Sequence, residues 1–197
     1  STPLATGTNG VVDGTAHQTA LDKFEAYSFN ALGVVTTDEV TKGLYINYNK
    51  RLRDEVGQKF QAVIYNKAAD YEGVVNVKNK ATEDEAALVY WVTGIIAGCE
   101  VNRSNLNKRY DGEFTVEADY TQAQLEAAIK AGEFALHKVG SDIRVLSDVN
   151  SLVTVSDTKG EIFKDNQTIR VMDQIANDIA VLFNTKYLGT VPNDAAG

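Results

Sequence analysis

The chain has 197 residues, of which 44% are hydrophobic and 23% charged, and its formal net charge is −8. These fractions are ordinary for a globular domain, and the acidic balance argues against a nucleic-acid or membrane-surface partner, because phosphate binding needs clustered Lys and Arg. No run approaches the ~20 apolar residues of a membrane span. No basic-then-apolar start indicates a signal peptide, and the single cysteine excludes an intrachain disulfide.

The first hundred residues alternate between helical and strand patterns. Apolar spacing predicts helices over residues 16–27, 38–57 and 86–99, and short apolar runs predict strands over residues 32–35, 60–65 and 74–77. Asp38 and Glu39 place acid at the start of the second helix, and Thr82 with Glu85 predicts a capping box before the third. This alternation is typical of an α/β layer with a largely parallel sheet.

The second half of the chain predicts a helix followed by a β-hairpin. Thr121 and Gln124 have the spacing of a second capping box, which opens a helix that ends at Gly132. Residues 134–139 and 143–146 form the arms of the hairpin. Short apolar pairs predict two further strands, at Phe114 with Val116 and at Val153 with Val155. The fold class is therefore α/β (α+β): a mixed sheet with flanking helices, followed by a helix–β-hairpin region and a long C-terminal helix.

The C-terminal helix, expected over residues 165–187, has two distinct faces. Its apolar stripe consists of Ile169, Met172, Ile175, Ile179, Leu182 and Phe183. We expect this stripe to pack on the chain's own core, because exposing it would leave a large apolar patch. The opposite face carries Arg170, Asp173 and Asn177, and we expect it to stay in solvent, where a partner can contact it.

Two clusters have the composition of a ligand site but not its spacing. Residues 7–10, followed by Gly14, are glycine-rich but lack the Gly-Lys-Ser/Thr ending of a phosphate loop, so we interpret them as a turn. The acids at residues 83–85 point to different sides of a helix start, and we interpret them as partners of the helix dipole rather than as cation ligands.

The residues with nucleophilic or metal-ligating side chains are isolated from one another. His17 and His137 have no neighbouring Cys and no second His at i+4, and Cys99 ends an apolar helix with no base partner nearby. We therefore expect no catalytic, cofactor or metal site. The basic cluster of residues 50–55 is interpreted as a solvated face with i,i+4 ion pairs, and the alternative is a charged contact surface for another subunit.

Several segments, in order along nearly the whole chain, resemble contractile phage tail sheath proteins, especially those of Gram-positive prophages and phage-tail-like bacteriocins. The later segments are the more specific, with a helix at 125–132 before the hairpin and Asn166 to Asp173 at the start of the last helix. The segments that carry the resemblance are residues 4–10, 21–25, 29–32, 50–57, 60–63, 70–77, 125–132, 148–152, 166–173, 187–189 and 191–193.

The resemblance implies a structural protein whose copies form a helical lattice around an inner tail tube and contract when a baseplate triggers them. It implies no cofactor, no enzyme activity and no nucleic-acid or membrane partner, with assembly in the host cytoplasm and residence in a phage tail or similar particle. It also implies a sheath core domain over residues 1–160 and the start of a C-terminal domain over 161–197, as a core fragment without terminal arms. The rival interpretation is an α/β enzyme or small-ligand-binding domain, with polar groups gathered around a pocket after Thr36 and Tyr65.

Overall fold

The computed structural model describes residues 12–190, so residues 7–10 and 191–193 lie outside the described part of the chain. A four-stranded sheet forms its centre, and every neighbouring pair of strands in it is parallel. In the order of the sheet, its strands are β1 (Ala31–Val34), β2 (Gln61–Tyr65), β3 (Val74–Val77) and β4 (Glu133–Phe134). The predicted strands over 32–35, 60–65 and 74–77 are confirmed to within a residue.

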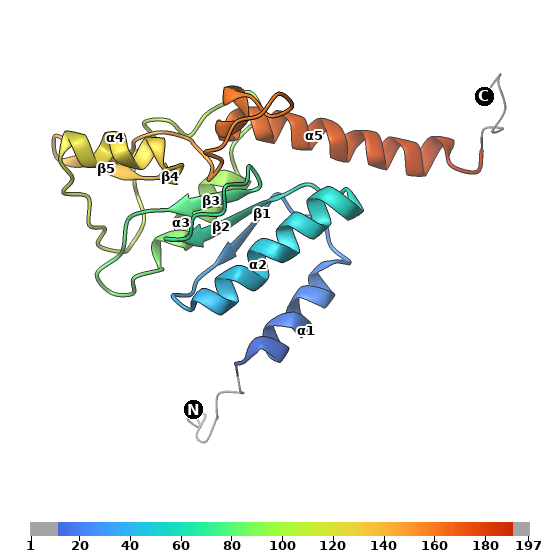
Figure 1. The fold of residues 1–197 in the computed structure, drawn as a ribbon, viewed down its shortest axis with the longest axis horizontal. Helices are drawn as coiled ribbons and strands as arrows, with labels where there is room; N and C mark the ends of the chain where they lie inside the picture. Colours follow the sequence, from blue (N-terminus) through green and yellow to red (C-terminus); the bar gives the residue numbers. More distant parts are fainter. Residues whose placement is uncertain (1–11, 191–197) are drawn as a thin grey trace, which may run out of the picture.

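Helices cover both faces of this sheet (Figure 1). One face carries α1 (Gly14–Phe24) and α2 (Glu39–Arg51), which continues into the π-helical η1 (Leu52–Val56), and the other face carries α3 (Leu88–Ala97). Along β2, Ala62 and Ile64 pack with the first pair of helices, whereas Val63 and Tyr65 pack with α3. Because strand side chains alternate between faces, this one strand contributes to both hydrophobic clusters.

The remaining elements lie against one side of this layer. They are α4 (Gln122–Lys130), the antiparallel hairpin of β5 (Leu136–Val139) and β6 (Asp142–Val145), the 3₁₀ turn η2 (Glu161–Lys164), α5 (Asn166–Leu182) and the π-helical η3 (Phe183–Tyr187). The capping box of Thr121 and Gln124 is confirmed, with both of its hydrogen bonds formed. The predicted fold class and the long C-terminal helix are also confirmed.

The capping box predicted at Thr82 and Glu85 is wrong. The N-cap of α3 is Ala87, which makes no side-chain cap, because the preceding segment is held by other contacts. The carboxylate of Glu83 accepts the backbone N–H of Thr115 at 3.0 Å, so this segment is bound to the chain around residue 115. Of the three acids at 83–85, Asp84 also accepts a backbone N–H, that of Ala86, at 3.0 Å.

The two short strands predicted from apolar pairs are also wrong. Val116 forms only an isolated bridge to Ala81, so Phe114 and Val116 make no strand. The segment with Val153 and Val155 is irregular, because the N–H of Val153 donates to the carboxylate of Asp70 at 2.7 Å instead of to a strand. Side-chain acceptors have displaced strand pairing in this segment.

We expect Gly132→Ala to lower the free energy of unfolding by more than Gly140→Ala. Both glycines have positive φ, 65° and 61°, where left-handed backbone costs an L residue about 1 kcal/mol or more. A Cβ on Gly132 would also meet the backbone oxygen of Asn150 at 2.9 Å, whereas a Cβ on Gly140 meets nothing within 4 Å. Urea unfolding of the two variants separates the cost of the left-handed backbone from the cost of the contact with Asn150. Equal losses of unfolding free energy would contradict the packing of the end of α4 on the 150–151 backbone.

We expect Asp70→Asn to destabilise the protein near neutral pH and to have a vanishing effect in acid. Hydrogen bonds from the side chain and backbone N–H of Thr154, and from the N–H of Val153, lower the pKa of the Asp70 carboxyl below 3.8. A depressed folded-state pKa stabilises the fold above the unfolded pKa, and this contribution is lost as pH falls through the folded pKa. Urea unfolding over a series from about pH 7 down to about pH 2 measures the difference, with Asp157→Asn, exposed on the 151–160 segment, as the control.

Candidate interaction surface

Helix α5 begins on the body of the molecule and extends away from it (Figure 1). Its start is fixed by the side chain of Asp165, which accepts the N–H of Thr168 at 2.9 Å as an N-cap. The hydrogen bonds and ion pairs that hold the helix to the body come from its polar face.

The strongest of these contacts is a buried ion pair between η1 and α5. The guanidinium of Arg53 donates to both carboxylate oxygens of Asp173, at 2.6 and 2.8 Å, and to the backbone oxygen of Phe60 at 2.7 Å. The two charged side chains are only 5% and 14% exposed. Burial opposes the charged form of Arg53, but the hydrogen bonds and negative charge of Asp173 outweigh it and raise the pKa of the guanidinium.

A second contact pairs a side-chain amide with the backbone. Asn177 accepts the N–H of Lys59 at 3.2 Å and donates to the carbonyl of Lys59 at 3.0 Å. One residue of α5 therefore satisfies both backbone groups of the residue two places before β2.

The first turn of α5 is tied to the sheet by a buried amide network. Asn166, which is fully buried, donates to the carboxylate of Asp148 and to the carbonyl of Val149, both at 3.0 Å, and accepts from Gln61 at 2.8 Å. Arg170, one turn later, has a 90%-buried side chain close to Asp148, at 3.7 Å. The three hydrogen bonds of the Asn166 side chain thus all go to other segments of this chain.

The structure reverses the orientation expected for α5. The prediction that its apolar stripe packs on the chain's own core is wrong, because only Ile169 is buried, at 1% exposure. The expectation that the face with Arg170, Asp173 and Asn177 stays in solvent is also wrong, since that face contacts η1 and the segment before β2. Contact of these three residues with a partner remains a prediction.

The physical reason for this orientation of α5 is the set of polar groups on the surface that the helix packs against. Arg53 is 4% exposed, and a buried charge without a partner is far more costly than an exposed apolar side chain. The polar face of α5 supplies the carboxylate for Arg53 and the amide for Lys59, which the apolar face cannot. Satisfying these groups therefore fixes the rotation of the helix.

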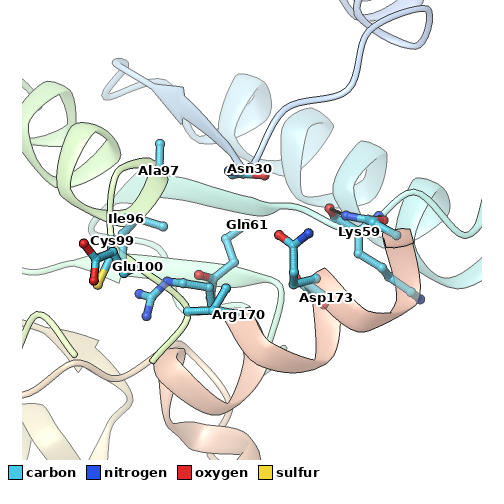
Figure 2. A pocket seen from close by; sticks show the side chains of 12 residues that line it. Asn30, Lys59, Gln61, Ile96, Ala97, Cys99, Glu100, Arg170 and Asp173 are labelled. Carbon is cyan, nitrogen blue, oxygen red and sulfur yellow. Dashed lines mark hydrogen bonds between the residues drawn. The ribbon is translucent and has the colours of Figure 1, made fainter. Parts of the chain in front are cut away.

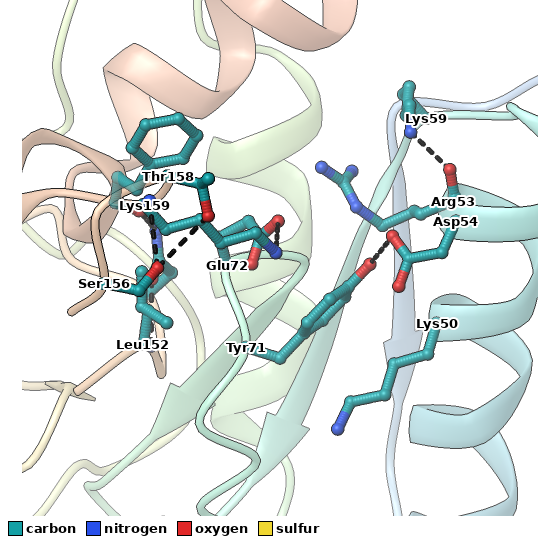
Figure 3. A network of polar contacts seen from close by, with 12 residues as sticks. Lys50, Arg53, Asp54, Lys59, Tyr71, Glu72, Leu152, Ser156, Thr158 and Lys159 are labelled. Carbon is teal, nitrogen blue, oxygen red and sulfur yellow. Dashed lines mark hydrogen bonds and ion pairs between the residues drawn. The ribbon is translucent and has the colours of Figure 1, made fainter. Parts of the chain in front are cut away.

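The basic cluster of residues 50–55 does not pair with itself as expected. Arg51 contacts Glu25, Arg53 pairs with Asp173, and Asp54 accepts the hydroxyl of Tyr71 at 2.7 Å (Figure 3). The helix becomes π-helical at Leu52, and this wider turn shifts residues out of i,i+4 alignment. The residues of this cluster therefore bind α2 and η1 to three other segments of the chain rather than forming a solvated face.

A small cavity lies between α5, the start of β2 and the end of α3 (Figure 2). Its volume is about 160 Å³, and its lining includes Gln61, Cys99, Glu100 and Arg170. Burial raises the pKa of the Cys99 thiol, which disfavours the thiolate that a nucleophile requires. The lining of the cavity mixes both signs of charge.

The region after Thr36, where an enzyme would gather polar groups, borders a cavity of about 550 Å³, and two carboxylates that line it cap helices. The carboxylate of Asp38 accepts the N–H of Thr41 at 2.7 Å, and that of Asp13 accepts the N–H of Ala16 at 2.8 Å. His17 contacts the hydroxyl of Tyr45, while His137 lies far along the chain on β5. Within residues 12–190, no three His, Cys, Asp or Glu side chains are grouped so that they could hold a metal ion.

Among the described helices, none combines the length and the apolar character that crossing a membrane requires.

Comparison with known proteins identifies two matched regions. Residues 10–151 match the family model of the phage tail sheath protein central domain, and residues 158–197 match that of the phage tail sheath C-terminal domain. The XkdK protein of the phage-like element PBSX from Bacillus subtilis is 34% identical over 165 residues, and the tail sheath protein of Clostridium phage phiCD119 is 30% identical over 179 residues. These matches cover 79% and 88% of this chain but only 35% and 50% of the two relatives.

A solved structure agrees with the sequence matches. The crystal structure of a sheath tail protein from Desulfitobacterium hafniense is 38% identical and superposes with a TM-score of 0.88. The superposition covers 99% of this chain and 48% of that protein. The chain therefore spans about half the length of the relatives it matches, or less.

Proposed function

Because this chain belongs to the phage tail sheath family, we propose that it is a structural subunit of a contractile tail sheath, which polymerises around an inner tail tube and contracts to drive the tube through a cell envelope. The observation that carries this proposal is the match of both sheath domains, in order, across residues 10–151 and 158–197. The 38% identity to a solved sheath tail protein over 99% of the chain supports it.

The proposal requires a rigid body with contact surfaces rather than a reaction site. Three of the acidic side chains have structural roles: Asp13 and Asp38 cap helices, and Glu83 accepts a backbone N–H. The partners that we propose are other copies of the sheath protein, the tube protein and the baseplate. Assembly would take place in the host cytoplasm, and the product would be a phage tail or a phage-tail-like particle.

We also propose that the sheath core domain extends over residues 1–160 and that residues 161–197 begin the C-terminal domain. The gap between the two matched regions, residues 152–157, lies a few residues before the proposed boundary and supports a division in this part of the chain. Contacts of α5 with η1 and β2 then become contacts between two domains, so Arg53 and Asp173 join the domains across their boundary.

Negative-stain electron microscopy of the product of the complete gene tests the proposed function. A sheath subunit should polymerise into striated tubes at high protein concentration, and adding the tube protein should set their inner diameter. A product that stays dispersed under both conditions, or that forms only amorphous aggregates, would contradict the proposal.

A further inference from the structure

The face of α5 that points away from the body is a continuous apolar stripe, here called the outward face. It consists of Met172, Ile175, Ile179, Leu182 and Phe183, with exposures of 43%, 53%, 61%, 49% and 54%. The first four are spaced three, four and three residues apart, which aligns them in one row along the helix. This is the spacing that a helix uses to pack into an apolar partner.

Nothing in residues 12–190 covers this row. The helix cannot turn it inward, because its polar face is held by the Arg53–Asp173 pair and by the amide of Asn177 on the Lys59 backbone. Exposed apolar stripes of this length mark interaction surfaces on otherwise globular proteins. A covering segment must therefore come from elsewhere.

The comparisons indicate which segment this is. All of α5 lies within residues 158–197, which match the sheath C-terminal domain, and the chain covers only 48% of the Desulfitobacterium relative. A domain is built by burying apolar faces against one another around its own core. Helix α5 has a polar face that contacts the central domain and an apolar face on the opposite side. This is the pattern of a helix that packs against two domains.

We propose that the outward face of α5 is the docking surface for the remainder of the sheath C-terminal domain. The helix then joins the central domain through Asp173 and Asn177 and enters the C-terminal core through Ile175 and Ile179, so the two domains move as one body. The proposal rests on family membership and on the packing of α5. It would hold even if the protein failed to form sheaths.

Thiol labelling tests the proposal on this chain and on a longer one. In a Cys99→Ser background, a cysteine is placed at Ile179 on the outward face or, as the matched control, at Glu126 on an exposed turn of α4. The longer chain carries, after residue 197, the part of the Desulfitobacterium protein that follows the superposed region. Reaction rates with a thiol reagent are measured for both positions in both chains.

In the 197-residue chain, the cysteines at 179 and 126 should react at similar rates. In the longer chain the rate at 179 should fall at least about tenfold, since the reagent then reaches the thiol only through local opening, while the rate at 126 should not change. An unchanged rate at 179 would overturn the proposal. Protection of 179 in the 197-residue chain that grows with protein concentration would overturn it in favour of a second copy.

Fast labelling at 126 with a non-cooperative thermal melt would show that the fusion is unfolded. In that case the same two cysteines are placed at the aligned positions of the full-length Desulfitobacterium protein, which crystallises as a folded chain. Protection at the position aligned with Ile179, but not at that aligned with Glu126, supports the proposal, and equal rates overturn it.

Discussion

Replacing Asp173 by alanine should lower the free energy of unfolding by about 3–5 kcal/mol, the loss expected when one member of a buried ion pair is removed. The guanidinium of Arg53 is 5% exposed on its side chain, donates two hydrogen bonds to Asp173 and has no second carboxylate that it bonds among the described residues. Its charge would remain buried, with the carbonyl of Phe60 as its hydrogen-bond partner. Urea unfolding followed by circular dichroism gives the difference.

Two controls separate the ion pair from helix packing in general. The double variant Arg53→Met with Asp173→Leu removes both charges and should be less destabilised than Asp173→Ala, because no buried charge is left without a partner. Asp178→Ala, on an exposed position of the same helix, should change the free energy of unfolding by about 0.5 kcal/mol or less. A loss for Asp173→Ala no larger than that for Asp178→Ala would mean that α5 does not dock through its polar face.

Replacing Asn166 by alanine should cost about 2–4 kcal/mol, since each buried polar group left without a partner costs roughly 1–3 kcal/mol. The amide of Asn166 bonds the carboxylate of Asp148, the carbonyl of Val149 and the amide of Gln61. Asp148 keeps the backbone N–H of Asn105 at 2.8 Å, so its charge stays partly satisfied.

The matched control for this variant is Asn184→Ala, at an exposed position near the end of the same helical segment. This variant removes an amide side chain that faces solvent, so it should change the urea midpoint of unfolding little. If the two asparagine variants unfold at the same urea concentration, the network at the start of α5 contributes nothing measurable to stability.

Elements with a local signal could be predicted from the sequence. The apolar runs of β2 and β3 are short, rich in Val and Ile and bounded by polar turns, so strands at these positions depend little on the rest of the chain. The box of Thr121 and Gln124 formed because both of its hydrogen bonds lie within one turn. The box expected at Thr82 failed because Thr115, far away in the sequence, binds Glu83 instead.

The rotation of α5 could not be predicted, because it is decided by a residue 120 positions earlier in the chain. The apolar stripe correctly predicted a helix. The rule that an apolar helix face turns toward the core, however, assumes that this core is formed by the same part of the chain. Arg53 looked like one member of a solvated basic cluster. Only its burial beneath α5 makes the polar face of that helix the inner one.

The π-helical turn is the second feature without a sequence signal. Lys50 to Glu55 have the spacing of i,i+4 ion pairs in a regular α-helix, but the turn widens at Leu52. Asp54 consequently faces Tyr71, whose pKa is raised by burial and by the hydrogen bond to this carboxylate. Tyr71 in turn lies near the ammonium groups of Lys50 and Lys159, so tertiary contacts account for the departure from the regular pattern.

The most direct test of the assignment as a sheath subunit is electron microscopy of the particles produced by the genome that encodes this chain, with the gene intact and with an early stop codon in it. The intact genome should yield tails with a striated, contractile outer layer, and the stop codon should leave bare inner tubes, with the layer restored when the gene is supplied in trans. Particles that keep a complete contractile sheath despite the stop codon would contradict the account.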